Sequence, residues 1–185
     1  IQTLACRKYS ILRQVQLISC DYQLKWRQDM TQRANYFGLA PDAMQILLDQ
    51  ESYLLNQFKA SNLVSVTMWE LIKLRVSQIN QCAYCIDMHV KDALTMRVSF
   101  ERIVGLNAWR DTLLYSDVER QGLEWAELIT LGKEVTNESY QKTLNTFGAE
   151  TMVNLTIAIN AINSWNRIAK TFKPEVGHYK AKLAE

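Results

Sequence analysis

Residues 70–89 read ELIKLRVSQINQCAYCIDMH and hold most of the reactive side chains of this 185-residue chain. The stretch contains the chain's single C-x-x-C pair, Cys82 and Cys85, and one of its two histidines, His89. In a helical conformation these three residues fall at i, i+3 and i+7 and share one face. Glu70 belongs to an apolar helical segment just before them. The sequence therefore predicts two consecutive helices that carry a carboxylate, two thiols and an imidazole.

The spacing of Cys82 and Cys85 leaves three interpretations open. A thiol reacts as its thiolate, and an adjacent imidazole, a helix N-terminus and a second sulfur all favour that form. We therefore favour a redox dithiol. Two buried cysteines could instead act as small hydrophobic side chains, or they could form part of a zinc site with His89 and Glu70. A second C-x-x-C or an H-x-x-x-H, which would favour zinc, does not occur in the sequence.

His89 and Glu70 each have a structural and a catalytic interpretation. A lone histidine is more often a satisfied core residue, but the i+4 spacing from Cys85 favours an imidazole that takes up a thiol proton. From spacing alone, Glu70 is expected to be exposed and paired with Lys73 at i+3. Its alternative role is a partly buried carboxylate that orients His89 and raises the basicity of the ring.

Hydrophobic periodicity predicts an all-α fold in a single domain. Pro41 suits the first position of a helix, and Ser116 and Glu119 form a capping box. Period-2 alternation is almost absent and no Asn-Gly or Asp-Gly dipeptide occurs, so no hairpin is expected. Helices are predicted over residues 41–59, 66–79, 82–97, 99–109, 117–135, a shorter segment capped by Asn137, and 149–172, before Pro174.

Composition limits the class of protein. A hydrophobic content of 48% and only two prolines suit a compact helical protein. No apolar run approaches the ~20 residues that span a bilayer, so no membrane association is expected. Four cysteines at low density favour a reducing cytosol, and therefore a cytoplasmic location. The net charge of +2 comes from residues 1–29, with five basic and two acidic residues, so nucleic acid is not an expected partner.

Residues 1–29 differ in character from the rest of the chain. They mix apolar and basic residues without the apolar region or the cleavage site of a signal peptide. We expect residues 1–29 to be an atypical extension that is poorly structured or not native. Residues 30–185 are then expected to form the helical domain, with Met30 as the functional start.

At Glu70, Cys82, Cys85 and His89 the sequence follows the pattern Glu-x11-Cys-x2-Cys-x3-His. This pattern resembles the active-site signature of the alkylhydroperoxidase D-like family, which belongs to the carboxymuconolactone decarboxylase superfamily. The similarity continues in LNAWRDTLLYSDVER and AINSWNRIA and covers most of the chain from about Met30 onward. The resemblance implies a helical bundle, self-association into a homo-oligomer, and a thiol-dependent peroxidase or disulfide oxidoreductase. No cofactor and no metal are expected.

The resemblance also implies roles for the motif residues. Glu70 polarises His89, directly or through water, and the imidazole draws a proton from the dithiol. The thiolate reduces a hydroperoxide, the Cys82–Cys85 disulfide forms, and an external dithiol or thiol protein reduces it. Cys85 is the expected attacking sulfur because it neighbours His89, although exposure at the helix start would favour Cys82. The main alternative is a non-enzymatic redox-sensing or stress-response protein. A metal-binding protein is a second and less favoured alternative.

Two positions depart from the family pattern. Tyr84 stands where some members have a histidine that joins the proton relay, so it is a secondary candidate that could donate a hydrogen bond or simply pack. Gln81 stands where a small residue such as glycine is frequent. A polar group near the end of the chain is expected to fix helix packing or a subunit contact: Asn160, Asn163, Trp165, Asn166 and Arg167.

Overall fold

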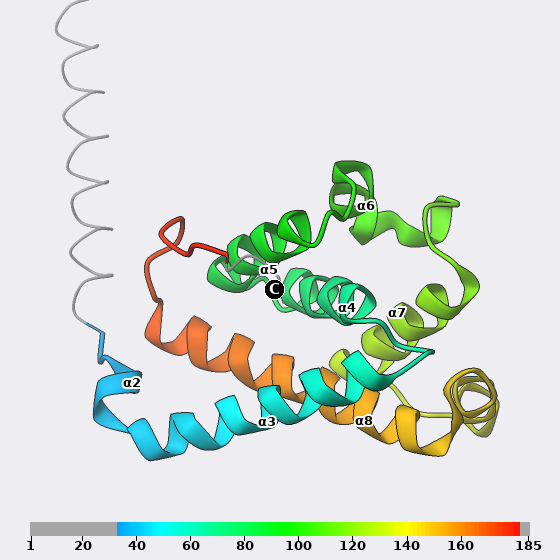
Figure 1. The fold of residues 1–185 in the computed structure, drawn as a ribbon, viewed down its shortest axis with the longest axis horizontal. Helices are drawn as coiled ribbons and strands as arrows, with labels where there is room; N and C mark the ends of the chain where they lie inside the picture. Colours follow the sequence, from blue (N-terminus) through cyan, green and yellow to red (C-terminus); the bar gives the residue numbers. More distant parts are fainter. Residues whose placement is uncertain (1–32, 182–185) are drawn as a thin grey trace, which may run out of the picture. The chain divides into compact units, whose positions relative to one another are not determined.

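The computed structural model of the chain describes residues 33–181. From Tyr36 onward these residues form one compact unit of helices (Figure 1), and no strand occurs among them, which confirms the all-α prediction. In chain order the elements are α2 (Tyr36–Leu39), α3 (Pro41–Ala60), α4 (Val66–Ile79), α5 (Ala83–Thr95), α6 (Phe100–Val104), the 3-10 helix η1 (Gly105–Asp111), α7 (Asp117–Thr130) and α8 (Asn137–Phe172).

Helix α4 forms the centre of this unit and contacts α3, α5, α7, α8 and η1. Figure 1 shows α4 and α5 side by side, above α8. A helix surrounded by other elements must be apolar on most of its faces. The buried side chains of α4 accordingly include Leu71, Ile72, Leu74 and Val76. Glu70 lies among them with 1% of its surface exposed, so this carboxyl group is held inside the protein.

Side-chain caps determine where two of the later helices begin. The predicted capping box of α7 is present, with Ser116 and Glu119 each accepting a backbone N–H of the other. Helix α8 begins differently from the prediction, because its N-cap residue is Thr136 and not Asn137. The hydroxyl group of Thr136 accepts the N–H of Ser139 at 3.2 Å. Threonine is a favoured residue at this position for that reason.

Two predicted helices are shorter or more irregular than expected. The helix predicted over 117–135 ends at Thr130, because Gly132 takes a left-handed conformation with φ +61°. Glycine adopts such a backbone at little steric cost and commonly follows a helix end. The helix predicted over 99–109 is the short α6 followed by η1, in which Ala108 departs from helical geometry with φ −117° and ψ 29°.

Helix α8 is bent at a single glycine. Gly148 has φ +70° and ψ 166°, which interrupts the helix before the segment predicted over 149–172. The end of α8 agrees with the prediction: it finishes at Phe172, and Lys173 takes a left-handed conformation with φ +47° directly before Pro174. The long second part of α8 is the part that reaches the cysteine motif.

The predicted extension, residues 1–29, lies outside the described residues. Within residues 33–181, no helix is both long and apolar enough to cross a membrane.

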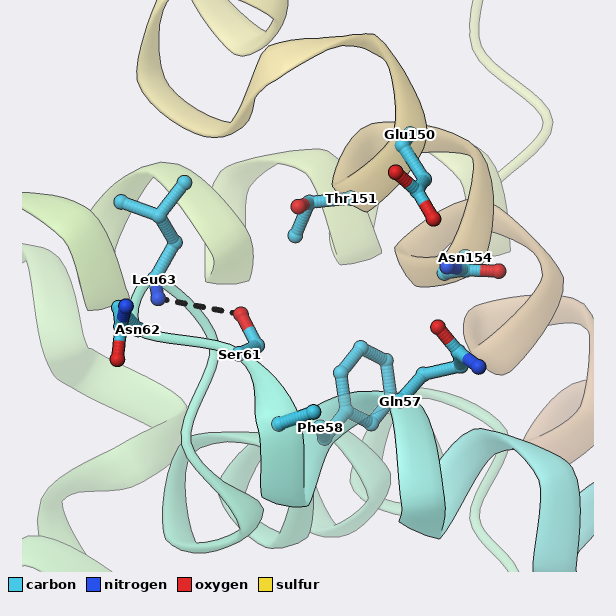
Figure 2. A pocket seen from close by; sticks show the side chains of 9 residues that line it. Gln57, Phe58, Ser61, Asn62, Leu63, Glu150, Thr151 and Asn154 are labelled. Atoms are coloured by element: carbon cyan, nitrogen blue, oxygen red, sulfur yellow. Dashed lines mark hydrogen bonds between the residues drawn. The ribbon is translucent and has the colours of Figure 1, made fainter.

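A cavity of about 330 Å³ lies between the end of α3 and the part of α8 after the bend (Figure 2). Its wall is mostly polar, and the hydroxyl oxygen of Ser61 accepts the N–H of Leu63 at 3.1 Å. No cysteine or histidine is among the residues that line it. It therefore offers no redox or proton-transfer chemistry of the kind that the sequence motif predicts.

Candidate active site

The turn between α4 and α5 determines where the two cysteines lie. Gln81 takes a left-handed conformation with φ +54°, and Cys82 is the N-cap residue of α5. The N–H of Cys82 donates to the carbonyl oxygen of Ser77 at 3.0 Å, which closes the turn. A left-handed backbone is strained for a residue with a side chain and costs glycine little. This gives a physical reason for a glycine at position 81 in similar sequences.

A disulfide joins Cys82 and Cys85, whose Cα atoms lie 5.3 Å apart. The pairing that the family resemblance implied is therefore present. Both cysteines are buried, with 1% and 2% of their surfaces exposed, and they pack with Ala169 of α8. The expected exposure of Cys82 at the start of the helix is wrong, because α8 packs over this end of α5.

His89 and Glu70 meet inside the protein. The Nδ1 atom of His89 lies 2.6 Å from Oε1 of Glu70, and the two side chains are 3% and 1% exposed. The other carboxylate oxygen of Glu70 lies 2.7 Å from Nζ of Lys73. The pairing with Lys73 was thus predicted correctly, but the exposed position expected with it is wrong. A carboxylate at Nδ1 favours the tautomer whose Nε2 is a base, and no described residue gives this buried Nε2 a hydrogen bond.

The surrounding charges keep Glu70 ionised. Burial by itself would raise the pKa of this carboxyl group. The Lys73 ammonium, His89 and the hydrogen bonds from both outweigh burial and lower the pKa of Glu70 to about 2. The Lys73 ammonium also lies over the ring of Trp69, 4.1 Å from its centre. At neutral pH, Glu70 therefore presents a charged acceptor to the imidazole of His89.

A cavity of about 230 Å³ lies beside the disulfide. Cys85 and His89 both line it, whereas Cys82 does not. Glu51, Lys73 and Asp92 bring charged or polar groups to its wall. The rest of the wall is largely apolar and aromatic and comes from α2, α3, α5 and α8: Tyr36, Phe37, Leu48, Met88, Ile162 and Trp165.

Tyr84, the secondary candidate, also lines this cavity. It packs against the cluster formed by Cys82, Cys85 and Ala169. The packing role considered from the sequence is therefore observed. A part for its hydroxyl group in proton transfer remains a prediction.

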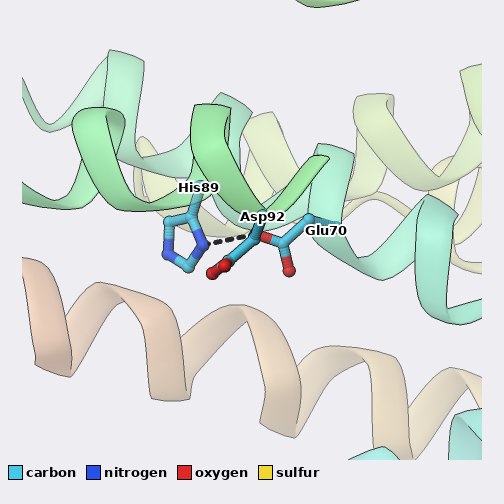
Figure 3. Close-up of side chains that lie close together, drawn as sticks. All are labelled: Glu70, His89 and Asp92. Atoms are coloured by element: carbon cyan, nitrogen blue, oxygen red, sulfur yellow. Dashed lines mark hydrogen bonds and ion pairs between the residues drawn. The ribbon is translucent and has the colours of Figure 1, made fainter. Parts of the chain in front are cut away.

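Glu70, His89 and Asp92 place one possible metal ligand each within 4.8 Å of one another (Figure 3). This set differs from the zinc set considered from the sequence, because the two cysteines of the motif are bonded to each other. Both oxygens of Asp92 accept a hydrogen bond from the Tyr179 hydroxyl, at 2.9 and 3.1 Å. A cation at this position would have to displace that hydroxyl group and the groups that contact Glu70.

Two asparagines of α8 hold the turn that precedes the cysteines. The side-chain amide of Asn80 donates to Oδ1 of Asn163 at 2.8 Å and to Oδ1 of Asn166 at 2.9 Å. Nδ2 of Asn166 donates in turn to the hydroxyl oxygen of Ser77 at 3.0 Å. Asn163 and Asn166 are 5% and 0% exposed. The structural role predicted for the polar group of α8 is thus observed at these two residues.

Asn160 and Arg167, two other members of that predicted group, bond within α8 itself. The amide of Asn160 donates to the carbonyl oxygen of Thr156 at 3.0 Å, and Arg167 donates to the carbonyl oxygen of Asn163 at 2.9 Å. Within the predicted group, the buried pair that holds the turn is therefore Asn163 with Asn166.

Glu51 is a cavity residue that the sequence analysis did not predict. The Nε1–H of Trp165 donates to Oε1 of Glu51 at 3.1 Å, across 114 positions of the chain. One signal for it was available. Glu51 follows the buried Met44 by seven residues and precedes the buried Leu54 by three, so a carboxyl group interrupts the apolar face of α3.

Comparisons with known proteins agree with this geometry. Residues 41–128 match the carboxymuconolactone decarboxylase family. YdfG of Bacillus subtilis, an uncharacterized protein, is 44% identical over 142 residues, which cover 76% of this chain and 93% of YdfG. YnjA of Escherichia coli, also uncharacterized, is 27% identical over 94 residues, which cover 50% of this chain and 52% of YnjA.

Two solved structures resemble the fold. One, from Agrobacterium tumefaciens, is a protein of unknown function suggested to be the antioxidant defence protein AhpD. It is 33% identical, with a TM-score of 0.71 over 80% of this chain and 99% of that one. A peroxidase-related protein from Silicibacter, 18% identical with a TM-score of 0.65 over 77% and 75% of the two chains, shares the fold. With the motif at Glu70, Cys82, Cys85 and His89, these similarities show that the chain belongs to the alkylhydroperoxidase D-like family, within the carboxymuconolactone decarboxylase family.

Proposed function

We propose that this chain is a thiol-dependent peroxidase that reduces hydroperoxides with the Cys82–Cys85 dithiol and is regenerated by disulfide exchange. One observation carries the proposal: a disulfide whose Cys85 shares a cavity with His89. The Nε2 atom of that histidine is buried and receives no hydrogen bond from the described residues. A basic nitrogen and a redox-active sulfur on one cavity wall are what a thiol peroxidase needs.

The proposed cycle begins with both thiols reduced. His89 takes the proton of the Cys85 thiol on Nε2, while Glu70 holds its Nδ1–H and stabilises the imidazolium that forms. The thiolate attacks one oxygen of the hydroperoxide, the O–O bond breaks, and Cys85 becomes a sulfenic acid. The Cys82 thiol then displaces water from it and the disulfide forms. Two electrons from the dithiol thus convert the hydroperoxide into an alcohol and water.

Cys85 is the proposed attacking sulfur, and Cys82 the resolving one. Cys85 and His89 both line the cavity that a hydroperoxide would enter, and Cys82 does not. An external dithiol returns the enzyme to its reduced form by exchange. Because the two cysteines are 1% and 2% exposed, this reductant reaches a sulfur either through the same cavity or after a local opening of the α4–α5 turn.

A redox sensor without turnover is the second candidate. The burial of both sulfurs favours it, because a reductant that reaches a disulfide slowly leaves the protein oxidised after one reaction. The two functions share the oxidation step and differ in how often it is repeated.

The test uses reduced protein in which Cys6 and Cys20 are replaced by serine, so that only the motif thiols are counted. Cumene hydroperoxide is added in several-fold excess over protein. Peroxide consumption is followed with dihydrolipoamide present, and the free thiols of the protein are followed in a parallel sample without it. We expect several turnovers per chain, lost in both Cys82→Ser and Cys85→Ser, and a sulfenic acid trapped in Cys82→Ser alone. Consumption of one equivalent of peroxide per chain, with loss of both motif thiols and no further turnover, would identify the sensor. Thiols that survive the peroxide would refute both candidates.

A further inference from the structure

Glu51 is a carboxyl group in the cavity that the cycle described above does not use. It enters the cavity from α3, whereas Cys85 and His89 enter it from α5. Its Oε1 atom accepts the indole N–H of Trp165 at 3.1 Å. The indole therefore fixes the position of the carboxyl group in a cavity whose wall is otherwise largely aromatic and aliphatic.

The environments of Glu51 and Glu70 shift the pKa values of these two carboxyl groups in opposite directions. Glu70 is paired directly with Lys73 and His89, which keep it ionised. Burial and the nearby charge of Glu70 raise the pKa of Glu51, and they outweigh the opposing effects of Lys73, His89 and the Trp165 hydrogen bond. Glu51 therefore keeps its proton to a higher pH than an exposed glutamate does.

The other titratable groups of the cavity wall are less suited to donate a proton. Burial raises the pKa of Asp92 as well, but both of its oxygens already accept from the Tyr179 hydroxyl, which holds the carboxyl group away from a substrate. The pKa of Tyr36 is raised by burial and by Tyr84, which makes its phenol a weaker acid than usual. Tyr84 packs against the disulfide.

Peroxide reduction needs an acid on the side of the cavity away from the sulfur. The thiolate attacks one oxygen along the O–O bond, and the second oxygen leaves in the opposite direction as an alkoxide. An alkoxide is about as basic as hydroxide, whose conjugate acid has a pKa of about 15.7, so a proton supplied as the bond breaks lowers the barrier. His89 has by then taken up the thiol proton beside the attacking sulfur.

We propose that Glu51 is the general acid that protonates the departing alkoxide. In this step the Cys85 S–O bond forms, the O–O bond breaks, and the Glu51 carboxyl proton passes to the leaving oxygen. The products are a sulfenic acid, an alcohol and the Glu51 carboxylate. Glu51 then regains a proton from solvent, and His89 releases the one that it took from the thiol. This assignment rests on the proposed peroxidase function.

The test compares two oxidants whose leaving groups differ in basicity. The leaving group of cumene hydroperoxide is an alkoxide, which needs the proton. The leaving group of peracetic acid is acetate, which does not. Reduced wild type and Glu51→Gln are mixed with each oxidant, and the rate of thiol oxidation is measured by stopped flow. Glutamine keeps an acceptor oxygen for the Trp165 N–H and removes the acidic proton.

We expect Glu51→Gln to slow the reaction with cumene hydroperoxide by about 100-fold, the usual size of a general-acid effect. The rate with peracetic acid is expected to stay within about threefold of wild type, because acetate departs unaided. In wild type the cumene hydroperoxide rate should also fall at high pH as Glu51 loses its proton, and the variant should lack this decline. Asp92→Asn serves as the matched carboxyl control and should change both rates by the same factor.

If Glu51→Gln slows the reactions with both oxidants equally, the residue only shapes the cavity. If the rate with cumene hydroperoxide is unchanged, Glu51 is not the acid. Either result overturns the assignment while leaving the peroxidase function in place. A wild-type protein that consumes neither oxidant would refute the peroxidase function itself, and the role of Glu51 with it.

Discussion

Replacing Asn80 with alanine removes the two hydrogen bonds that its side chain makes to α8, and leaves the bond from Lys170 to its backbone carbonyl oxygen in place. The lost donors serve Oδ1 of Asn163 and Oδ1 of Asn166, at 2.8 and 2.9 Å. Rotating either amide by half a turn would not give its oxygen a new partner without breaking another hydrogen bond. Nδ2 of Asn166 already donates to Ser77, and Nδ2 of Asn163 donates to the hydroxyl group of Thr130.

The expected loss of stability follows from the burial of the two acceptor oxygens. A hydrogen bond contributes about 1 kcal/mol net, and a buried acceptor left without a partner costs about 1–3 kcal/mol. Two such acceptors, one of them fully buried, give a loss of about 3 kcal/mol in the free energy of unfolding for Asn80→Ala. For a chain of this size, that loss lowers the Tm by about 6–12 °C.

The assay is urea unfolding of the oxidised protein at one fixed protein concentration, since self-association would otherwise contribute to the result. Asn160→Ala is the matched control. Asn160 is an exposed asparagine whose amide bonds within α8, so its removal should change stability by no more than about 0.5 kcal/mol. An Asn80→Ala loss below about 1 kcal/mol, or one equal to that of the control, would refute the reasoning.

The same substitution should expose the disulfide to reductant. If dithiothreitol reaches the sulfurs only when the α4–α5 turn opens, a loss of about 3 kcal/mol raises the open population, and the reduction rate, by about 100-fold. Free thiols released by dithiothreitol measure this rate. An unchanged rate would mean that the reductant enters the cavity without any opening of the turn.

Two further substitutions test the strain at the turn and the charge balance of the site. Gln81→Gly should stabilise the protein by about 1 kcal/mol, since residue 81 has φ +54°, whereas Gln45→Gly inside α3 should destabilise it by about as much. Urea unfolding measures both, and a destabilised Gln81→Gly would contradict the strain. The pKa of Glu70 is lowered to about 2 from an ordinary 4.5, so its stabilising effect is complete above pH 4.5 and is lost as the pH falls toward 2. The stability difference between wild type and Glu70→Gln should therefore shrink over that range, and a difference that stays constant in acid would count against an ionised, paired Glu70.

The sequence was sufficient for features that depend on neighbours along the chain. Helix α3 starts at Pro41, and the capping box of Ser116 starts α7, because both signals act within one helical turn. The motif residues come together because two consecutive helices pack in contact. The helix end before Gly132 was missed although glycine is a common stop signal, because the prediction continued the helix through it to residue 135.

The features of the site that the sequence did not predict depend on α8. The burial of Cys82 comes from packing with Ala169, and the position of Glu51 in the cavity comes with its bond to Trp165. Pairs so far apart in the chain leave no periodic signal. Periodicity reports which face of a helix is apolar, and it does not report which distant helix covers that face.

The dependence of the cysteine site on α8 also affects the protein while it is being made. The ribosome completes Cys82 and Cys85 before it reaches Asn163, Asn166 and Ala169, the α8 residues that hold the turn and cover the sulfurs. At a synthesis rate of about 5–20 residues per second, the roughly 80 residues between them take about 4–16 s. Throughout that interval the nascent chain carries two thiols without their cover. The cysteine pair is therefore enclosed by a segment that is synthesised after it.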